Sequence, residues 1–545
     1  MDPATVGPVP AVAADTGGRP LMTHRQVLEA LSGLMLAMLV AILSSTVVST
    51  SLPRIIADLG GSQASYTWVV TATLLAMTVT IPIWGKLADL MQRKLLVQGA
   101  LVIFTTGSIL AGLSESTSWL IGCRVVQGIG VGGLTALVQV VMSDLVSPRE
   151  RGRYMGYLGA VMAVGTIGGP LLGGVLTDTV GWRWNFYVGV PVAFAALLVL
   201  QRTLKLPPMP RRRVNFDIAG ATTLSSGVSL LLVWVSLAGS SYAWLSWQTA
   251  VMLPAALLLC ALTVRIVSRA EEPLVPLWLF KDRVVVLAVL GTIGVGIAMF
   301  GTSLFLSQYM QLARGETPTV SGLLTLPMVV GVMVSSTVIG QVVARTGRYK
   351  RWMLAGAVML TLGMVLMGTV DETTSMVDLG IFMAMLGIGV GMMMQNLVLV
   401  VQNSVAPSVV GAATGLVSFS RSLGGTIGVA ALGAILTAQV ATLIGSGMAD
   451  HGIAASAAGD GALPKIDELT PVMRDIVEHA YGVGIGHVFM IAAPFGILAF
   501  VSILFMKEKP LGTRSGIEQA AGTTTEAEAQ PATGSMQTLP RPKTA

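Results

Sequence analysis

Apolar stretches of about 20 residues recur along this chain, and they constrain its fold more than any other feature. They run from Leu28 to Met506 with only short polar interruptions. As a helix, about 20 residues cross the roughly 30 Å hydrocarbon core of a bilayer. The composition agrees, because 53% of the 545 residues are hydrophobic, 11% are charged, and the mean hydropathy is +0.77. The sequence therefore predicts an all-α polytopic membrane protein.

Division of these stretches at charges, prolines and glycine clusters predicts 14 transmembrane helices. Basic residues near helix ends remain on the cytoplasmic side of a membrane. Most of the 33 Lys and Arg residues fall in segments that 14 spans place on one side, which we predict to be the cytoplasmic side, together with both termini. This asymmetry accounts for the net charge of +6, so no nucleic-acid partner is indicated. The predicted spans begin near Leu28, Tyr66, Leu95, Trp119, Tyr154, Trp184, Asp217, Trp247, Val284, Pro318, Trp352, Val377, Gly411 and Ile485.

Cysteine and histidine usage indicates neither a disulfide framework nor a metal site. Cys123 and Cys260 lie far apart in apolar stretches, and the four histidines have no ligand spacing. No cluster of His, Glu or a nucleophile falls at membrane depth, so we expect neither an enzyme nor a cofactor. The first 25 residues lack the basic start of a cleaved signal peptide.

A short polar motif, GKLADLMQRK at 85–94, separates the second and third predicted spans. A Gly, an acid four residues later and a basic pair can form a tight turn whose charges pair in one conformation and separate in another. Here these residues are Gly85, Asp89, Arg93 and Lys94. The motif resembles the signature of the major facilitator superfamily in this loop.

A second copy of the motif, GQVVARTGRYKR at 340–351, has a Gly and basic residues but no acid. We predict that Gly340 and Arg348 form a conformational latch together with Gly85, Asp89, Arg93 and Lys94 of the first copy. The repeat also predicts two related six-helix halves with helices seven and eight inserted between them. The predicted divisions are an N-terminal tail at 1–25, a first half at 26–206, an inserted pair at 207–283, a second half at 284–506 with a long outer loop at 439–484, and a disordered cytoplasmic tail at 507–545. Within the outer loop, Thr470 and Pro471 predict the start of a short amphipathic helix.

Three further motifs extend the resemblance to the superfamily and its drug exporters, and the one in the first span resembles that of the 14-helix proton-coupled drug exporters of the EmrB and QacA kind. IGCRVVQGIGVGG at 121–133 resembles the Arg-bearing motif of the fourth helix, and LSSTVVSTSLPRIIADLGG at 43–61 resembles the motif of the first, with Ser44 where the family usually has Asp. GTIGGPLLGG at 165–174 resembles the Gly-Pro motif of the fifth helix, whose small residues allow close helix packing. The residues predicted to make this contact are Gly165, Gly168, Gly169, Pro170, Gly173 and Gly174.

Arg124 and Arg421 are the charged residues that fall well inside predicted spans. An arginine within the membrane costs several kcal/mol unless it faces the bundle interior, water or a partner. Each therefore either anchors its helix through polar neighbours or takes part in coupling. Asp178, beside Arg183, is our first candidate for proton binding, with an interfacial salt bridge as the alternative. Because two cations and no central acid line the expected cavity, we expect neutral amphiphiles or anions to be transported at least as well as cations.

The resemblance implies a secondary active exporter of small amphiphilic compounds or drugs in a bacterial cytoplasmic (inner) membrane, driven by the proton gradient through alternating access. Export of one endogenous metabolite, lipid or antibiotic on the same scaffold is the alternative. We expect small-molecule substrates and the lipid bilayer as partners of a monomer. Polar groups beside aromatic and Met residues predict promiscuous binding, and the candidates are Ser44, Gln127, Phe305, Gln308, Tyr309, Gln311, Met392, Gln395 and Asn396.

Overall fold

The computed structural model describes residues 24–60, 63–204, 217–238, 242–270, 272–316, 318–451, 453 and 470–512. Residues 1–23 and 513–545, which hold most of the two predicted tails, lie outside this part of the chain. His24 and Arg25, which we assigned to the N-terminal tail, instead belong to the first helix.

Nearly all described residues are helical. The first group of helices is α1 (His24–Asp58), α2 (Gln63–Leu90), α3 (Arg93–Gly112), α4 (Thr117–Leu145), α5 (Pro148–Thr179), α6 (Trp184–Tyr187) and α7 (Gly189–Thr203). The central pair is α8 (Ile218–Leu237) and α9 (Trp247–Val267). The second group is η1 (Leu277–Lys281), α10 (Arg283–Gln308), the π-helical turn η2 (Tyr309–Ala313), α11 (Pro318–Leu324), α12 (Leu326–Thr346), α13 (Lys350–Met367), α14 (Met376–Ser404), η3 (Pro407–Val409), α15 (Val410–Asp450) and α16 (Pro471–Leu504).

Polar residues at the helix ends explain several of these boundaries. The Ser116 side chain accepts a hydrogen bond from the Trp119 N–H at the start of α4, and the Ser246 side chain accepts one from the Thr249 N–H at the start of α9. Gly347 ends α12 in the left-handed region, with φ of 68°, a conformation that glycine adopts without steric cost. Short polar sequences thus separate long apolar helices.

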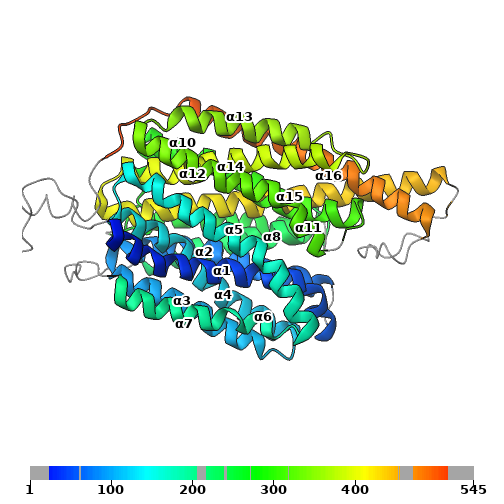
Figure 1. Cartoon of the computed structure of the whole chain (residues 1–545), viewed down its shortest axis with the longest axis horizontal. Helices are drawn as coiled ribbons and strands as arrows, with labels where there is room; N and C mark the ends of the chain where they lie inside the picture. Colours follow the sequence, from blue (N-terminus) through cyan, green and yellow to red (C-terminus); the bar gives the residue numbers. More distant parts are fainter. Residues whose placement is uncertain are drawn as a thin grey trace, which may run out of the picture.

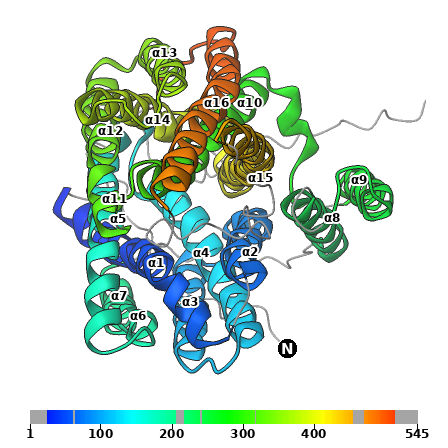
Figure 2. The same cartoon turned by 90° about the vertical axis from the view of Figure 1, so that its right-hand side faces the viewer.

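The helices form two bundles, α1–α7 and α10–α16, with α8 and α9 at one side (Figure 2). Two helix pairs make the largest contacts between the bundles: α5 packs against α12, and α2 packs against α15. The α8 helix touches both α2 and α15, and α9 packs against α8. We call the face that carries the α2–α3, α4–α5 and α12–α13 loops the basic face, after its many Lys and Arg residues.

The predicted 14-helix, all-α membrane fold is confirmed. Within the described residues, thirteen helical segments are long and apolar enough to cross a membrane. The remaining predicted span is α5, a helix of 32 residues with an uncharged, glycine-rich middle. Those glycines are used in packing, as described below.

The predicted long loop at 439–484 is wrong at both ends. The α15 helix continues to Asp450, and the last helix already starts at Pro471 rather than forming a separate short one. The two helices project beyond the rest of the molecule as a hairpin, gold and orange in Figure 1. Buried Met448, Ile476 and Val477 give this hairpin its own apolar contact, which span-by-span hydropathy does not reveal.

The predicted disordered tail also begins too early, because residues 507–512 are held against the basic face. The Glu508 carboxylate accepts hydrogen bonds from the backbone N–H of Tyr349 and of Lys350, at 2.9 and 3.1 Å. Lys509 pairs with Asp282 at 3.2 Å. These polar contacts order a segment that has little apolar sequence of its own.

Candidate functional site

The predicted latch motif joins the two bundles at the basic face. Asp89, at the end of α2, accepts hydrogen bonds from the backbone N–H of Gly411 at 2.8 Å and of Ala412 at 2.7 Å. These N–H groups belong to the first turn of α15, where the helix has no internal partners for them and its dipole favours a negative charge. The acid of the motif therefore binds the helix start of the opposite bundle.

Gly85 allows the two helices to approach closely enough for this contact. A Cβ atom on Gly85 would lie 2.7 Å from the carbonyl oxygen of Gly411 and 3.0 Å from the Cα of Gly415. Real Cβ atoms essentially never approach backbone this closely, so a larger residue would push α2 away from α15. Lys86, the next residue, lies 3.7 Å from Glu272 in the segment after α9.

The basic residues of the motif bind within the first bundle. Arg93 forms an ion pair with Asp144 at the end of α4, and its Nε donates to the Ala88 carbonyl at 3.1 Å. Lys94 donates to the carbonyl of Gln201 at 2.7 Å. The pairing across bundles is therefore made by Asp89, while the bases connect the start of α3 to α2, α4 and α7.

The second copy of the motif does not form an equivalent contact. Gly340 is buried in α12, but the Arg348 side chain is exposed, and among the described residues no hydrogen bond or ion pair involves its guanidinium. Without an acid such as Asp89, this turn cannot bind a helix start in the other bundle. Arg348 is thus not part of a latch in this structure.

A second polar contact between the bundles lies deeper in the membrane, and the sequence analysis identified only one of its members. Gln139 of α4 donates from Nε2 to Gln395 Oε1 of α14 at 3.0 Å. Gln402, also on α14, donates to the Gln139 carbonyl at 3.3 Å and to the Thr414 hydroxyl at 2.9 Å. Gln139 and Gln402 interrupt apolar runs in the sequence, and that interruption is the signal that could have identified them.

The glycine motif packs α5 against α1 as predicted for its spacing. A Cβ on Gly173 would lie 2.7 Å from the Val47 carbonyl oxygen, and one on Gly165 would lie 2.8 Å from the Ile42 side chain. One on Gly169 would overlap the Thr46 hydroxyl, which donates to the Gly165 carbonyl at 2.9 Å. Gly168 is different, since its nearest atom in Leu43 is 3.9 Å away. Pro170 and Gly174 lie on the same helix, and the Pro170 side chain is outside the described part.

Arg124 is buried, with 4% exposure, and hydrogen bonded within the first bundle. Its Nη1 donates to Gln127 Oε1 at 3.0 Å, and Gln127 Nε2 donates to the Ser108 hydroxyl at 2.8 Å. Its Nε points to the Val69 carbonyl at 3.4 Å. This chain of bonds connects α4 to α2 and α3, and it satisfies the guanidinium without an acid.

Arg421, in the second bundle, is equally buried, with 4% exposure, but has no comparable partners. Within the part of the chain that the structure describes, its Nη1 makes no hydrogen bond. Arg183 differs from both, because it is exposed, donates to the Ser114 carbonyl at 3.1 Å and lies over the Trp182 ring at 4.3 Å. The side chain of Asp178, its predicted neighbour, lies outside the described part.

The family follows from comparison with known proteins. The model of the Major Facilitator Superfamily matches residues 34–429. The chain belongs to this superfamily. It is therefore a multi-pass membrane transporter and not an enzyme.

Relatives of this facilitator include a protein named as a multidrug transporter. It is 35% identical over 414 residues to the multidrug transporter protein MdtP of Bacillus subtilis, with 76% of each chain covered. It is 34% identical over 504 residues to the uncharacterized MFS-type transporter Rv1877 of Mycobacterium tuberculosis, which covers 92% of this chain and 73% of that protein. The crystal structure of the human organic anion transporter MFSD10 (TETRAN) has the same fold, with a TM-score of 0.58 and 15% identity over 88% of this chain and 99% of that one.

The predicted substrate residues of this facilitator are dispersed rather than gathered in one cavity. Gln395 lies between the bundles, and Gln127 belongs to the Arg124 chain of bonds. Ser44 is buried beside Gly189 of the same bundle, and the Tyr309 hydroxyl donates to the Asp371 carbonyl at 2.7 Å, at the face opposite the basic one. The others lie within the second bundle: Gln311 donates to Ser307, Asn396 donates to the Met392 carbonyl, Gln308 Oε1 is buried without a partner in the described part, and Met392 packs on Gly356.

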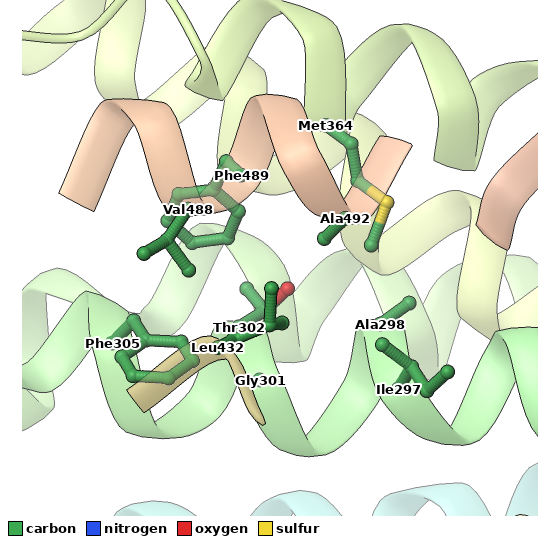
Figure 3. A pocket seen from close by; sticks show the side chains of 10 residues that line it. All are labelled: Ile297, Ala298, Gly301, Thr302, Phe305, Met364, Leu432, Val488, Phe489 and Ala492. Carbon is green, nitrogen blue, oxygen red and sulfur yellow. The ribbon is translucent and has the colours of Figure 1, made fainter. Parts of the chain in front are cut away.

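Phe305, the remaining candidate, lines an apolar pocket inside the second bundle of the facilitator (Figure 3). The pocket is a small gap with no room for a water molecule, and it lies where α10, α13, α15 and α16 meet. Figure 3 labels its lining, which is apolar except for the Thr302 hydroxyl: Ile297, Ala298, Gly301, Thr302, Phe305, Met364, Leu432, Val488, Phe489 and Ala492. This gap therefore belongs to the close packing of the second bundle.

Proposed function

We propose that this facilitator is a secondary active exporter of small amphiphilic compounds or drugs that exchanges them for protons by alternating access. One observation carries the proposal: Asp89 of the first bundle binds the N-terminal turn of α15 in the second. A contact of this kind closes the basic face and has to break if that face is to open. It supports a cycle in which the two bundles move against each other.

Further support comes from the relatives and from the charge distribution. The similarity to MdtP, which is named a multidrug transporter, favours drug-like substrates. The basic loops favour a cytoplasmic location for the basic face and for both termini. We place the protein in a bacterial cytoplasmic membrane as a monomer without a cofactor, with small molecules and lipids as its partners.

Transport in vesicles under an imposed pH gradient tests the proposal. Inverted vesicles that contain the protein should accumulate amphiphilic dyes when the interior is acidic, and a proton ionophore should abolish the accumulation. Vesicles with the Asp89→Asn variant should accumulate dye more slowly. Equal accumulation with and without the ionophore would exclude proton exchange. A growth-inhibition panel distinguishes an exporter of many drugs from an exporter of one endogenous metabolite, lipid or antibiotic. Protection against one compound alone would favour the second.

A further inference from the structure

Arg421 differs from every other arginine inside the membrane-spanning part that the structure describes. It shares its 4% exposure with Arg124, but Arg124 has a side-chain amide and a backbone carbonyl as acceptors. Arg421 Nη1 has no acceptor among the described residues, and the neighbouring Ser418 hydroxyl also lacks a partner there. A buried guanidinium without a hydrogen-bond acceptor costs several kcal/mol, so we expect its partner to come from outside the chain.

The backbone of α15 around Arg421 packs closely against α10. On α15, Gly424 faces Ile293, Gly425 faces Phe300 and Gly428 faces Ile297, all three on α10. Arg421 lies on the same side of α15, since its carbonyl oxygen is in contact with Gly296 of that helix. The contact between α10 and α15 therefore offers the Arg421 guanidinium no charged side chain.

Carboxylates on the helices around α15 are at helix ends, and several are already bound. The helices that pack on α15 are α2, α4, α8, α10, α14 and α16. Asp89 binds the start of α15 itself, Asp144 pairs with Arg93, and Asp378 accepts from the Ser375 hydroxyl at 2.8 Å. The described helices α8 and α10 contain no acid. The remaining acids on α15 and α16 are Asp450, Asp475 and Glu478, in the projecting hairpin far from Arg421 along the helices.

We propose that Arg421 binds the acidic group of a transported organic anion, a carboxylate or sulfonate attached to an apolar body. A guanidinium binds such groups through two parallel hydrogen bonds, and a bound anion would supply the missing counter-charge. Arg421 lies two turns after Thr414 on the same face of α15, and Thr414 is joined through Gln402 to Gln139 of the first bundle, so separation of the bundles gives the anion access to this face. The inference rests on the proposed export function and specifies its substrate class.

Two dyes with the same three-ring xanthene core test the inference: fluorescein, an anion at pH 8, and rhodamine 123, a cation. Binding of each dye to purified protein is measured by fluorescence polarisation without any gradient. We expect Arg421→Gln to weaken fluorescein binding about tenfold and to change rhodamine 123 binding less than about twofold. Arg421→Lys should weaken fluorescein binding by a smaller factor, because it keeps the charge and loses the paired hydrogen bonds. Arg269→Gln, which removes an exposed arginine after α9, should change neither.

Two outcomes would overturn the anion site. One is wild-type protein that binds rhodamine 123 but not fluorescein, and the other is an equal loss of both dyes in Arg421→Gln and Arg421→Lys. Thermal unfolding of both variants identifies a folding defect, and the lysine variant still decides the question if the glutamine variant is unfolded. Transport in vesicles is scored separately. Arg421-dependent fluorescein binding without proton-driven movement of either dye would keep the anion site and reject the proposed export.

Discussion

The Asp89 carboxylate accepts a hydrogen bond of 2.8 Å from the backbone N–H of Gly411, and this bond joins the two bundles at the basic face. A charge at a helix N-terminus contributes about 0.3 to 2 kcal/mol. Asp89→Asn removes the charge and should therefore increase opening of this face by up to about thirtyfold. The measurement is maleimide labelling of buried Ala412 changed to cysteine, in a background without Cys123 and Cys260.

A matched acid provides the control for that experiment. Asp58 ends α1 at the opposite face and is exposed. Asp58→Asn should leave labelling at position 412 unchanged. Labelling that is the same in Asp89→Asn as in the parent protein would contradict the role of Asp89 in closing the basic face.

Two glycines of the same helix give opposite expectations for alanine substitution. Gly173→Ala places a Cβ 2.7 Å from the Val47 backbone, and the resulting overpacking should cost about 1 to 3 kcal/mol. Gly168→Ala has room, with its nearest neighbour 3.9 Å away, and should be neutral or slightly stabilising because alanine favours the helix. Thermal unfolding in detergent measures both. Equal melting temperatures for the two variants would show that α5 does not depend on this contact with α1.

The amide contact between Gln139 and Gln395 predicts an energetic coupling across the bundles. Each single change to Leu leaves a buried amide without its partner, whereas the double change removes both. A double-mutant cycle on thermal stability should therefore give a coupling of about 0.5 to 1.5 kcal/mol. The exposed pair Gln98 and Gln201, joined by a bond of 3.0 Å, is the control and should give less. Additive effects at Gln139 and Gln395 would mean that the contact does not contribute.

Residue chemistry explains which parts of the site the sequence could predict. Arg124 and Arg421 were identified because a charge within an apolar span needs a special environment wherever the span packs. The glycine motif was identified because small residues at helical spacing permit close approach. The contacts of Asp89 and Gln139 with the second bundle were not identified, since hydropathy carries no information on how one bundle is placed against the other. The extension of α15 to Asp450 was missed for a related reason: it depends on packing against α16 outside the membrane.

The Arg124 chain of hydrogen bonds predicts a stability effect at Gln127. Gln127→Leu removes the 3.0 Å acceptor of Nη1 and leaves a buried guanidinium with only a 3.4 Å contact to Val69. We expect a loss of about 1 to 3 kcal/mol in the free energy of unfolding. Ser108→Ala, which removes only the acceptor of Gln127, should cost less. Denaturant or thermal unfolding in detergent measures the loss of stability in both variants. A smaller loss for Gln127→Leu than for Ser108→Ala would contradict the prediction.

Asp371, in the loop between α13 and α14, predicts a dependence of stability on pH. The Thr373 and Thr374 hydroxyls donate to its carboxylate at 2.8 and 2.9 Å, and these bonds lower its pKa below the ordinary value of 3.8. A carboxylate whose pKa is lower in the folded state contributes stability above its ordinary pKa and loses that contribution as the pH falls through the folded value. Asp371→Asn should therefore lower the melting temperature at pH 6 and have less effect at pH 3. Glu115→Gln, an exposed change in the α3–α4 loop, is the control. The same decrease at both pH values would show that the carboxylate charge is not what stabilises this loop.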